Sequence, residues 1–414
     1  MPSEKKVRSV TLPRGFRAAD ATCGIKASGK PDLSVIVSDR DCAAAGVYTR
    51  NKCPGAPLIV TRRHLRGGVA RAIVCNSGNA NDATGQRGID DASAMAAQVA
   101  EAIGCKTRQV VVGSTGVIGH FLPMNKVRCG IAEAMSSLDA GPDADARAAR
   151  GIMTTDLRPK AASRTLKLGG ETVRLGGIAK GSGMIAPNMA TMLVYITTDA
   201  AIDAAALRPA LRQAADASFN RISVDQHTSP SDMAVVLANG AAGNRMIRPG
   251  GGDYRIFTEV LTDLCRELAY MIVADGEGAT KVFRVCVLGA RSVRDADRIG
   301  KAVVDSPLVK TAVHGGDPNW GRVVTAAGYS GAALNPDRLS LDIGPDSDSA
   351  PNIRVFDRGV PTEINAATQR RLVAHMRRDR LRFTLDLRLG KSATEWLGCD
   401  LSRQYIAINA DYST

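Results

Sequence analysis

The hydrophobic positions of this 414-residue chain follow two different spacings. Apolar residues that recur every three to four positions predict amphipathic helices, whereas short runs rich in β-branched residues between turn residues predict strands. The expected helices cover 90–103, 123–138, 143–152, 202–218, 253–273, 296–304 and 364–377. Because helices and strands alternate along the chain, we expect a mixed, layered α/β architecture.

The predicted strands are short, and most of them precede the first of these helices. They occupy 8–13, 33–39, 44–50, 56–62, 72–75, 109–112 and 282–288. Gly169-Gly170 predicts the turn of a hairpin over 166–175. No internal repeat or low-complexity linker divides the chain, whose length suits two or three domains or one large α/β body.

The segment from Gly176 to Ala200 changes character in its middle. Up to Ala190 it is rich in glycine and predicts a loop, which carries one basic residue, Lys180. From Thr191 onwards a run of β-branched and apolar residues predicts a buried or half-buried strand. A threonine therefore stands first in a strand, directly after a loop.

Such a threonine can become a nucleophile if the chain is cut before it. A hydroxyl needs an adjacent base to react, and the α-amine freed by cleavage titrates at roughly 7.7–8.0. The Thr191 hydroxyl could itself attack the carbonyl of Ala190 in an N-to-O acyl shift that hydrolysis completes. The alternative is an ordinary strand threonine, which composition alone favours.

Two glycine-rich turns could complete such a site. In GSTGVIG, residues 113–119, the Thr115 hydroxyl and the Gly116 N–H could stabilise a developing oxyanion; the alternative is a tight strand-to-helix turn. In ADGEGATK, residues 274–281, the carboxylates of Asp275 and Glu277 could hold a substrate ammonium, unless this is only a solvated turn that ends a helix.

Composition limits the other classes of function. Nine scattered cysteines without a C-x-x-C pair, and five histidines without an H-x-x-x-H pair, favour a reducing cytoplasm over a disulfide framework or a metal site. We expect no membrane span and no secretory signal. The net charge of +13 keeps nucleic-acid binding as a hypothesis, but the basic residues are spread along the chain rather than clustered.

Several motifs together resemble the ornithine acetyltransferase family, also called bifunctional glutamate N-acetyltransferase/amino-acid acetyltransferase, of arginine biosynthesis. The resemblance covers essentially the full chain. Besides 176–200, 113–119 and 275–281, it rests on CNSGNAN at 75–81, MTTD at 153–156, KTAVHGGDPNWGR at 310–322, WLGCDL at 396–401 and INADYST at 408–414.

The resemblance implies an N-terminal-nucleophile-like sandwich that cuts itself between Ala190 and Thr191. The products would be an α chain, 1–190, and a β chain, 191–414, in an α₂β₂ assembly. The implied reaction is ping-pong: Thr191 takes acetyl from N²-acetylornithine and passes it to glutamate. No metal or bound cofactor is needed, and acetyl-CoA is a second donor only in bifunctional members.

The resemblance also implies the site residues. Thr191 is the nucleophile, and Thr115 with Gly116 forms the oxyanion hole. The implied substrate contacts are Thr154, Lys180, Thr191, Glu277, Asn409 and Thr414. Lys180 suits a substrate carboxylate and Glu277 a substrate ammonium, while Thr154 is preferred over Thr155 on spacing.

One segment departs from the family pattern. Where the family usually reads Val-Asp-Gly-Asp-Thr-Ser-Thr-Asn-Asp, residues 224–232 read VDQHTSPSD, so that Gln226 replaces a glycine and His227 an acid. This departure bears on substrate preference more than on the nucleophile. The competing hypotheses are an N-terminal-threonine amidohydrolase, an acyltransferase of another amino acid, and a basic nucleic-acid-binding protein.

Overall fold

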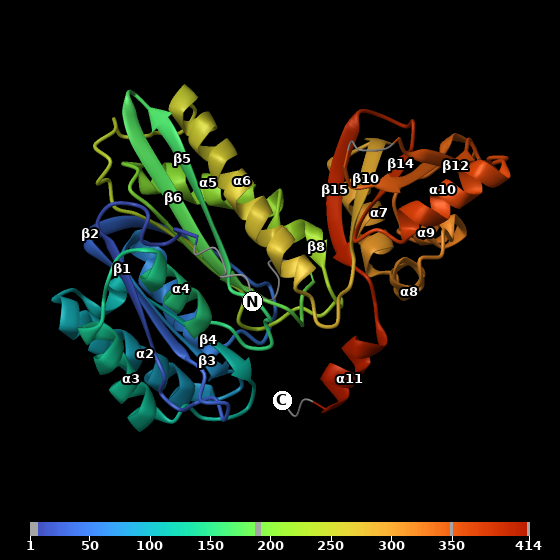
Figure 1. The fold of residues 1–414 in the computed structure, drawn as a ribbon. Helices are drawn as coiled ribbons and strands as arrows, with labels where there is room; N and C mark the ends of the chain where they lie inside the picture. The colour runs from blue at the N-terminus through green and yellow to red at the C-terminus, as the bar shows by residue number, and fades with distance from the viewer. Residues whose placement is uncertain (1–6, 187–191, 348–350, 412–414) are drawn as a thin grey trace.

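The computed structural model describes residues 7–186, 192–347 and 351–411, which form two mixed β-sheets with helices packed on them (Figure 1). In the described part of the chain the first sheet has eight strands, in the order β4-β3-β2-β9-β7-β6-β5, with β1 paired to β2. These strands are β1 (Phe16–Ala21), β2 (Leu33–Tyr48), β3 (Val69–Asn79), β4 (Val110–Val117), β5 (Lys160–Leu168), β6 (Glu171–Lys180), β7 (Leu193–Thr198) and β9 (Met233–Ala238).

The long strand β2 joins two halves of this sheet. Its first half pairs with β1 and β3, and its second half pairs with β9. The register against β3 shifts between Val37 and Cys42, and such irregularities let a strand bend from one layer into another. A buried core joins the inner faces of the two halves, with Ile73 on one side and Ile178 on the other.

Helices pack against both halves. They are α1 (Ala56–His64), α2 (Gly85–Ile103), α3 (Met124–Ser136), α4 (Pro142–Gly151), α5 (Ala204–Asp216) and α6 (Gly252–Ala274). One of them, α4, contributes to the core between the halves. α2 and α3 share a core with the half that contains β3 and β4, and α5 and α6 share one with the half that contains β6 and β7. The prediction of a mixed, layered α/β architecture is therefore confirmed.

The second sheet is built almost entirely from the last third of the chain. Its order is β13-β12-β11-β14-β10-β15-β8. The strands are β8 (Ile222–Ser223), β10 (Val282–Ala290), β11 (Ser340–Pro345), β12 (Ile353–Asp357), β13 (Val360–Pro361), β14 (Arg380–Asp386) and β15 (Ser392–Cys399). The helices are α7 (Val293–Asp305), α8 (Pro307–Gly315), α9 (Trp320–Gly328), α10 (Ala366–Met376) and α11 (Arg403–Asp411).

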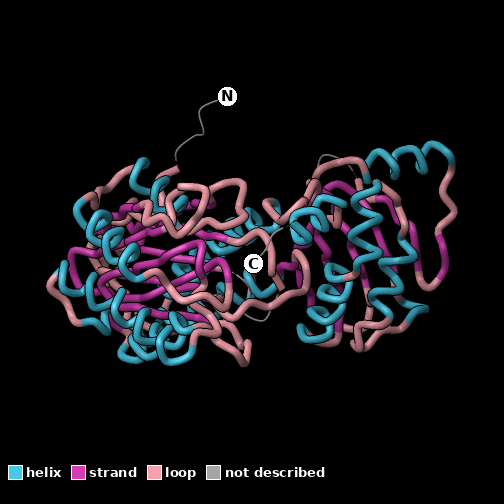
Figure 2. The backbone as a smooth tube through the Cα atoms, turned by 90° about the horizontal axis from the view of Figure 1, so that it is seen from below, coloured by secondary structure: helices cyan, strands magenta, loops and turns pink. Residues whose placement is uncertain are grey.

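The two sheets lie side by side and are connected through β8 and α6. β8 comes from the first unit but pairs in parallel with β15 of the second, and α6 runs down to the boundary between them (Figure 1). In the view of Figure 2 the strands of the two sheets remain in two separate bodies. No helix in the described ranges is long and apolar enough to cross a membrane.

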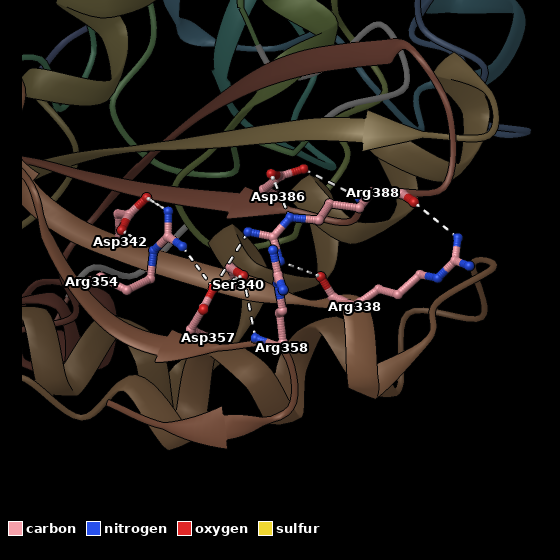
Figure 3. A network of polar contacts seen from close by, with 8 residues as sticks. All are labelled: Arg338, Ser340, Asp342, Arg354, Asp357, Arg358, Asp386 and Arg388. Atoms are coloured by element: carbon pink, nitrogen blue, oxygen red, sulfur yellow. Dashed lines mark hydrogen bonds and ion pairs between the residues drawn. The ribbon is translucent and has the colours of Figure 1, made fainter. Parts of the chain in front are cut away.

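An ion-pair network ties neighbouring strands of the second sheet together (Figure 3). Asp357 Oδ1 accepts hydrogen bonds from Ser340 Oγ at 2.6 Å and from Arg354 Nη1 at 2.7 Å. Arg354 also reaches Asp342, and Arg388 pairs with Asp386. These side chains come from β11, β12 and the end of β14, so the network has a structural role.

Most predicted helices are confirmed, with ends that shift by a few residues. The strand prediction over 56–62 is wrong, because these residues form helix α1 with Pro57 in its first turn, a position that suits proline. Residues 176–180 are also not loop but the end of β6. Likewise 113–117, predicted as a turn, continues strand β4.

Candidate active site

The ends of two strands bring Lys180 and Thr115 together. Lys180 is the last residue of β6, and Thr115 lies near the end of β4. Both side chains are buried, and Lys180 Nζ donates a hydrogen bond to Thr115 Oγ1 at 3.3 Å. Lys180 also pairs across the sheet with Leu193, the first residue of β7. The predicted oxyanion residue and carboxylate ligand are therefore neighbours.

Gly116 occupies a position that tolerates no side chain. Its φ is +129°, and a Cβ atom there would lie 2.4 Å from the carbonyl carbon of Gly78, far inside any van der Waals contact. The pairing of β3 with β4 is irregular at this point, because Asn79 faces both Thr115 and Val117. The glycine thus permits the close approach of two backbones at the proposed oxyanion hole.

Glu277 lies in the turn that follows α6, and two contacts fix its place. Its N–H donates to the carbonyl oxygen of Ser182 at 3.0 Å. Its carboxylate oxygen Oε2 accepts from Asn409 Nδ2 of α11 at 2.9 Å. A Cβ atom on Gly183 would lie within 2.6 Å of both carboxylate oxygens of Glu277. The segment after Lys180 therefore runs directly beside Glu277.

Thr154 joins the same region through its backbone. Its N–H donates to Asp156 Oδ2 at 2.9 Å, and the other oxygen of this carboxylate accepts from Gly181 N at 2.7 Å. Burial alone would raise the pKa of Asp156, but the ammonium groups of Lys180 and Lys160 and the hydrogen bonds outweigh burial and lower it. Asp156 is therefore a charged carboxylate between Thr154 and the Lys180 segment.

Six of the predicted site residues thus form a connected set of contacts: Thr115, Gly116, Thr154, Lys180, Glu277 and Asn409. Ala190, Thr191 and Thr414 lie outside the described residues. The nucleophile, the cleavage site and the terminal substrate contact accordingly stay predictions.

Sequence reasoning missed the charged side chains of Asp156, Lys160 and Asp225 around this set. It did single out Asp275, but as a ligand for a substrate ammonium rather than as the partner of Lys160. Asp156 and Asp275 both pair with the buried Lys160. Asp225 accepts hydrogen bonds from Met184 N at 2.6 Å and Ile185 N at 2.8 Å, and burial raises its pKa. The burial of Lys160 leaves no signal in the sequence, because one of its two carboxylate partners, Asp275, is distant along the chain.

The structure also places the segment that departs from the family pattern. Gln226 has a φ of +66°, a left-handed conformation that glycine adopts without strain, and its side chain donates to the carbonyl oxygen of Asp305 at the end of α7. Gln226 and His227 are both exposed. These two substitutions therefore face solvent and α7.

A buried ammonium and a carboxylate thus lie at neighbouring element ends of a layered α/β fold, an arrangement typical of enzymes that bind small charged substrates. In the described ranges no group of three or more His, Cys, Asp or Glu side chains is arranged to hold a metal ion.

Comparison with known proteins identifies the family. The model of the ArgJ family matches residues 17–414. The arginine biosynthesis bifunctional protein ArgJ of Symbiobacterium thermophilum is 48% identical over 408 residues, which is 98% of each chain. The chain belongs to the ArgJ family. This confirms the resemblance to the ornithine acetyltransferases.

Two solved structures of family members are each similar in sequence to about half of this chain. The crystal structure of the arginine biosynthesis bifunctional protein ArgJ of Bacillus halodurans is 38% identical, with a TM-score of 0.49, and covers 53% of this chain and 98% of its own. The ornithine acetyltransferase of Mycobacterium tuberculosis, crystallised with ornithine, is 39% identical, with a TM-score of 0.40, over 45% of this chain and 97% of its own.

Proposed function

We propose that this chain is an ornithine acetyltransferase that moves acetyl from N²-acetylornithine to glutamate through an acetyl group on Thr191. The observation that carries the proposal is the connected set of contacts from Thr115 through Lys180 to Glu277 and Asn409. Membership of the ArgJ family supports the same reaction. Thr191 becomes the N-terminal residue of the β chain when the Ala190–Thr191 bond is cut.

The charges of the site suit an α-amino acid. A lysine ammonium is a compact cation that binds carboxylates, and a glutamate carboxylate binds ammonium groups. We assign the substrate carboxylate to Lys180 and a substrate ammonium to Glu277, with Asn409 holding the Glu277 carboxylate. Thr154 and Thr414 complete the substrate contacts.

The transfer takes place in two halves. In the first, the Thr191 hydroxyl attacks the acetyl carbonyl of N²-acetylornithine while its own α-amine accepts the proton. Thr115 and Gly116 stabilise the oxyanion of the tetrahedral intermediate, a contribution of about 2.7–4 kcal/mol per donor. The amide C–N bond then breaks, the proton passes to the leaving nitrogen, and ornithine departs. In the second half the α-amine of glutamate attacks the acetyl ester by the reverse sequence, which gives N-acetylglutamate and restores the Thr191 hydroxyl.

Cleavage at Ala190–Thr191 yields fragments 1–190 and 191–414 that share one sheet. β6 lies in the first fragment and β7 in the second, and the two strands pair over 175–180 and 193–198. We therefore expect the fragments to stay associated, and we propose the α₂β₂ assembly that the family resemblance implies. Acetyl-CoA is a second acetyl donor if this member is bifunctional, as the name of its Symbiobacterium relative states for that protein.

Initial rates of acetyl transfer test the proposal. With purified protein, we expect parallel double-reciprocal plots for N²-acetylornithine and glutamate, and formation of N-acetylglutamate that exceeds release of acetate at about millimolar glutamate. Thr191→Ala is the inactive control. Release of acetate that outpaces N-acetylglutamate would make the protein a hydrolase instead.

A further inference from the structure

Three buried charged side chains lie outside the residues proposed to contact substrate. Lys160 begins β5, Asp156 precedes it in a loop, and Asp275 follows the last turn of α6. Lys160 Nζ is 2.6 Å from Asp156 Oδ1 and 2.6 Å from Asp275 Oδ2. The exposed fractions of the three side chains are 2%, 0% and 9% in the order Lys160, Asp156 and Asp275. They form a closed ionic cluster, and Lys160 donates its third hydrogen bond to the carbonyl oxygen of Arg158 at 3.4 Å.

Asp156 connects this cluster to two proposed substrate contacts. The oxygen that binds Lys160 also accepts from the N–H of Gly181, the residue after Lys180, at 2.7 Å. The second oxygen accepts from the N–H of Thr154 at 2.9 Å. One carboxylate therefore fixes the backbone on both sides of the proposed site, at Thr154 and at Lys180.

Asp275 makes the corresponding connection to Glu277. Its Oδ2 accepts from the N–H of Leu157 at 3.0 Å as well as from Lys160. Its carbonyl oxygen accepts from Ser182 Oγ at 2.6 Å, and the carbonyl oxygen of Ser182 in turn accepts from the N–H of Glu277 at 3.0 Å. The backbone around Glu277 is thus tied to the segment after Lys180 at two points.

The charge of the cluster is balanced by a second lysine, Lys180, which lies near Asp156. Two carboxylates around one ammonium leave a net charge of −1, which the nearby Lys180 ammonium offsets. Burying ions is costly, and apolar residues of similar volume often stabilise a core at least as well. What the ionic cluster adds is fixed positions for the groups that contact the ligand.

We propose that Asp156, Lys160 and Asp275 are positioning residues of the substrate site. They hold the backbone of Thr154, Lys180 and Glu277 in fixed relative positions without touching substrate themselves. Asp156 and Lys160 precede the Ala190–Thr191 bond and Asp275 follows it, so the Lys160–Asp275 pair also joins the two fragments beside the site after cleavage. This inference rests on the proposed function for the identity of the substrate contacts.

The test compares Asp156→Asn and Asp275→Asn with wild type. Lys167→Met serves as a surface control, because Lys167 is an exposed lysine on β5, the strand that begins at Lys160. Each protein is first checked for self-cleavage by intact mass and for folding by thermal melting. We expect the two cluster variants to lower kcat/KM for acetyl transfer by roughly 10- to 100-fold, mainly through KM, because small displacements of positioning groups have such effects. Lys167→Met should behave like wild type.

A second measurement tests whether the Lys160–Asp275 ion pair holds the two fragments together. We expect the fragments of cleaved Asp275→Asn to separate on size exclusion at a lower urea concentration than those of wild type and of Lys167→Met. If Asp156→Asn does not fold, Asp156→Glu keeps the charge but lengthens the side chain, and it should raise KM in the folded protein.

The outcomes separate this inference from the proposed function. Absence of acetyl transfer by the wild-type protein contradicts the proposed function, whatever the variants do. An active wild type whose folded variants keep the wild-type KM contradicts the positioning role, even if their melting temperatures fall. If the fragments of Asp275→Asn separate at the same urea concentration as those of wild type, the Lys160–Asp275 pair does not hold the fragments together.

Discussion

A single methyl group at Gly183 would test the assigned role of Glu277. The backbone of Gly183 is open to alanine, but the added Cβ would lie 2.3 Å from Glu277 Oε2. Because a side-chain end can move more easily than a backbone, we expect Gly183→Ala to fold and to displace the carboxylate. The KM for N²-acetylornithine should rise about tenfold, with a melting temperature close to that of wild type.

Gly315→Ala is the matched control for this change. Gly315 ends α8, and a Cβ atom there meets nothing within 4 Å. We expect its kinetics to equal those of wild type. A Gly183→Ala protein with unchanged KM would contradict the assignment of Glu277 as a substrate ligand.

Two buried carboxyl groups should make the stability of the protein depend on pH. Burial raises the pKa of Asp82 to about 6 and raises that of Asp232 well above its usual range. In the described part of the chain, Asp82 Oδ1 and Asp232 Oδ2 have no hydrogen-bond partner, which fits protonated acids better than ions. Asp82 Oδ2 accepts from Ser231 Oγ at 2.6 Å.

The sign of the effect follows from the raised pKa of Asp82. Between its unfolded value near 3.8 and its folded value of about 6, the folded chain binds more protons than the unfolded chain. The free energy of unfolding therefore falls as pH rises through this window. Asp82→Asn removes this titrating group. Between about pH 4 and pH 7, the free energy of unfolding measured with urea should therefore fall less in the variant than in wild type, by on the order of 2–3 kcal/mol. Equal pH slopes for the two proteins would contradict this account.

At the residue scale, the sequence identified candidate site residues better than it identified buried charged residues. Glycine-rich sequence marks Thr115, Lys180 and Glu277, although Thr115 and Lys180 lie near the ends of β4 and β6 rather than in turns. Lys160 could not be recognised, because only one of its two carboxylate partners is local; the other, Asp275, lies 115 positions away in the sequence. A pairwise contact of this kind leaves no local pattern.

At the scale of elements, periodicity predicted the long helices well. α3, α5 and α6 lie close to their predicted bounds because each presents a regular apolar face. The run over 56–62 was too short and too rich in β-branched residues to distinguish helix from strand. β4 and β6 extend further into glycine-rich sequence than predicted, because pairing with β3 and β7 holds these glycines in extended conformations.

Helix α11 should contribute to substrate binding but little to stability. None of its residues is buried, and it presents Asn409 to the Glu277 carboxylate at 2.9 Å. A hydrogen bond of this kind is worth about 1 kcal/mol, so Asn409→Ala should raise KM about fivefold. The melting temperature should stay unchanged, and steady-state kinetics beside a thermal melt check both statements. A clear fall in melting temperature without a change in KM would assign α11 a structural role instead.

At the scale of the whole molecule, the proposed cut falls between two paired strands of one sheet. β6 and β7 are neighbours in the sequence and antiparallel partners in the structure, so their pairing can survive loss of the bond between Ala190 and Thr191. The layered α/β class could be predicted from alternation of elements. The bend of β2 and the order of the strands could not, because they depend on pairings between distant segments.

Intact mass spectrometry of the purified protein, incubated with N²-acetylornithine and without glutamate, tests the central claim most directly. We predict two fragments that correspond to 1–190 and 191–414, with one acetyl group added to the second at Thr191 and removed again by glutamate. Thr191→Ala should remain one unacetylated chain. A wild-type chain that stays whole on long incubation, or an acetyl group that also appears on Thr191→Ala, would contradict the account.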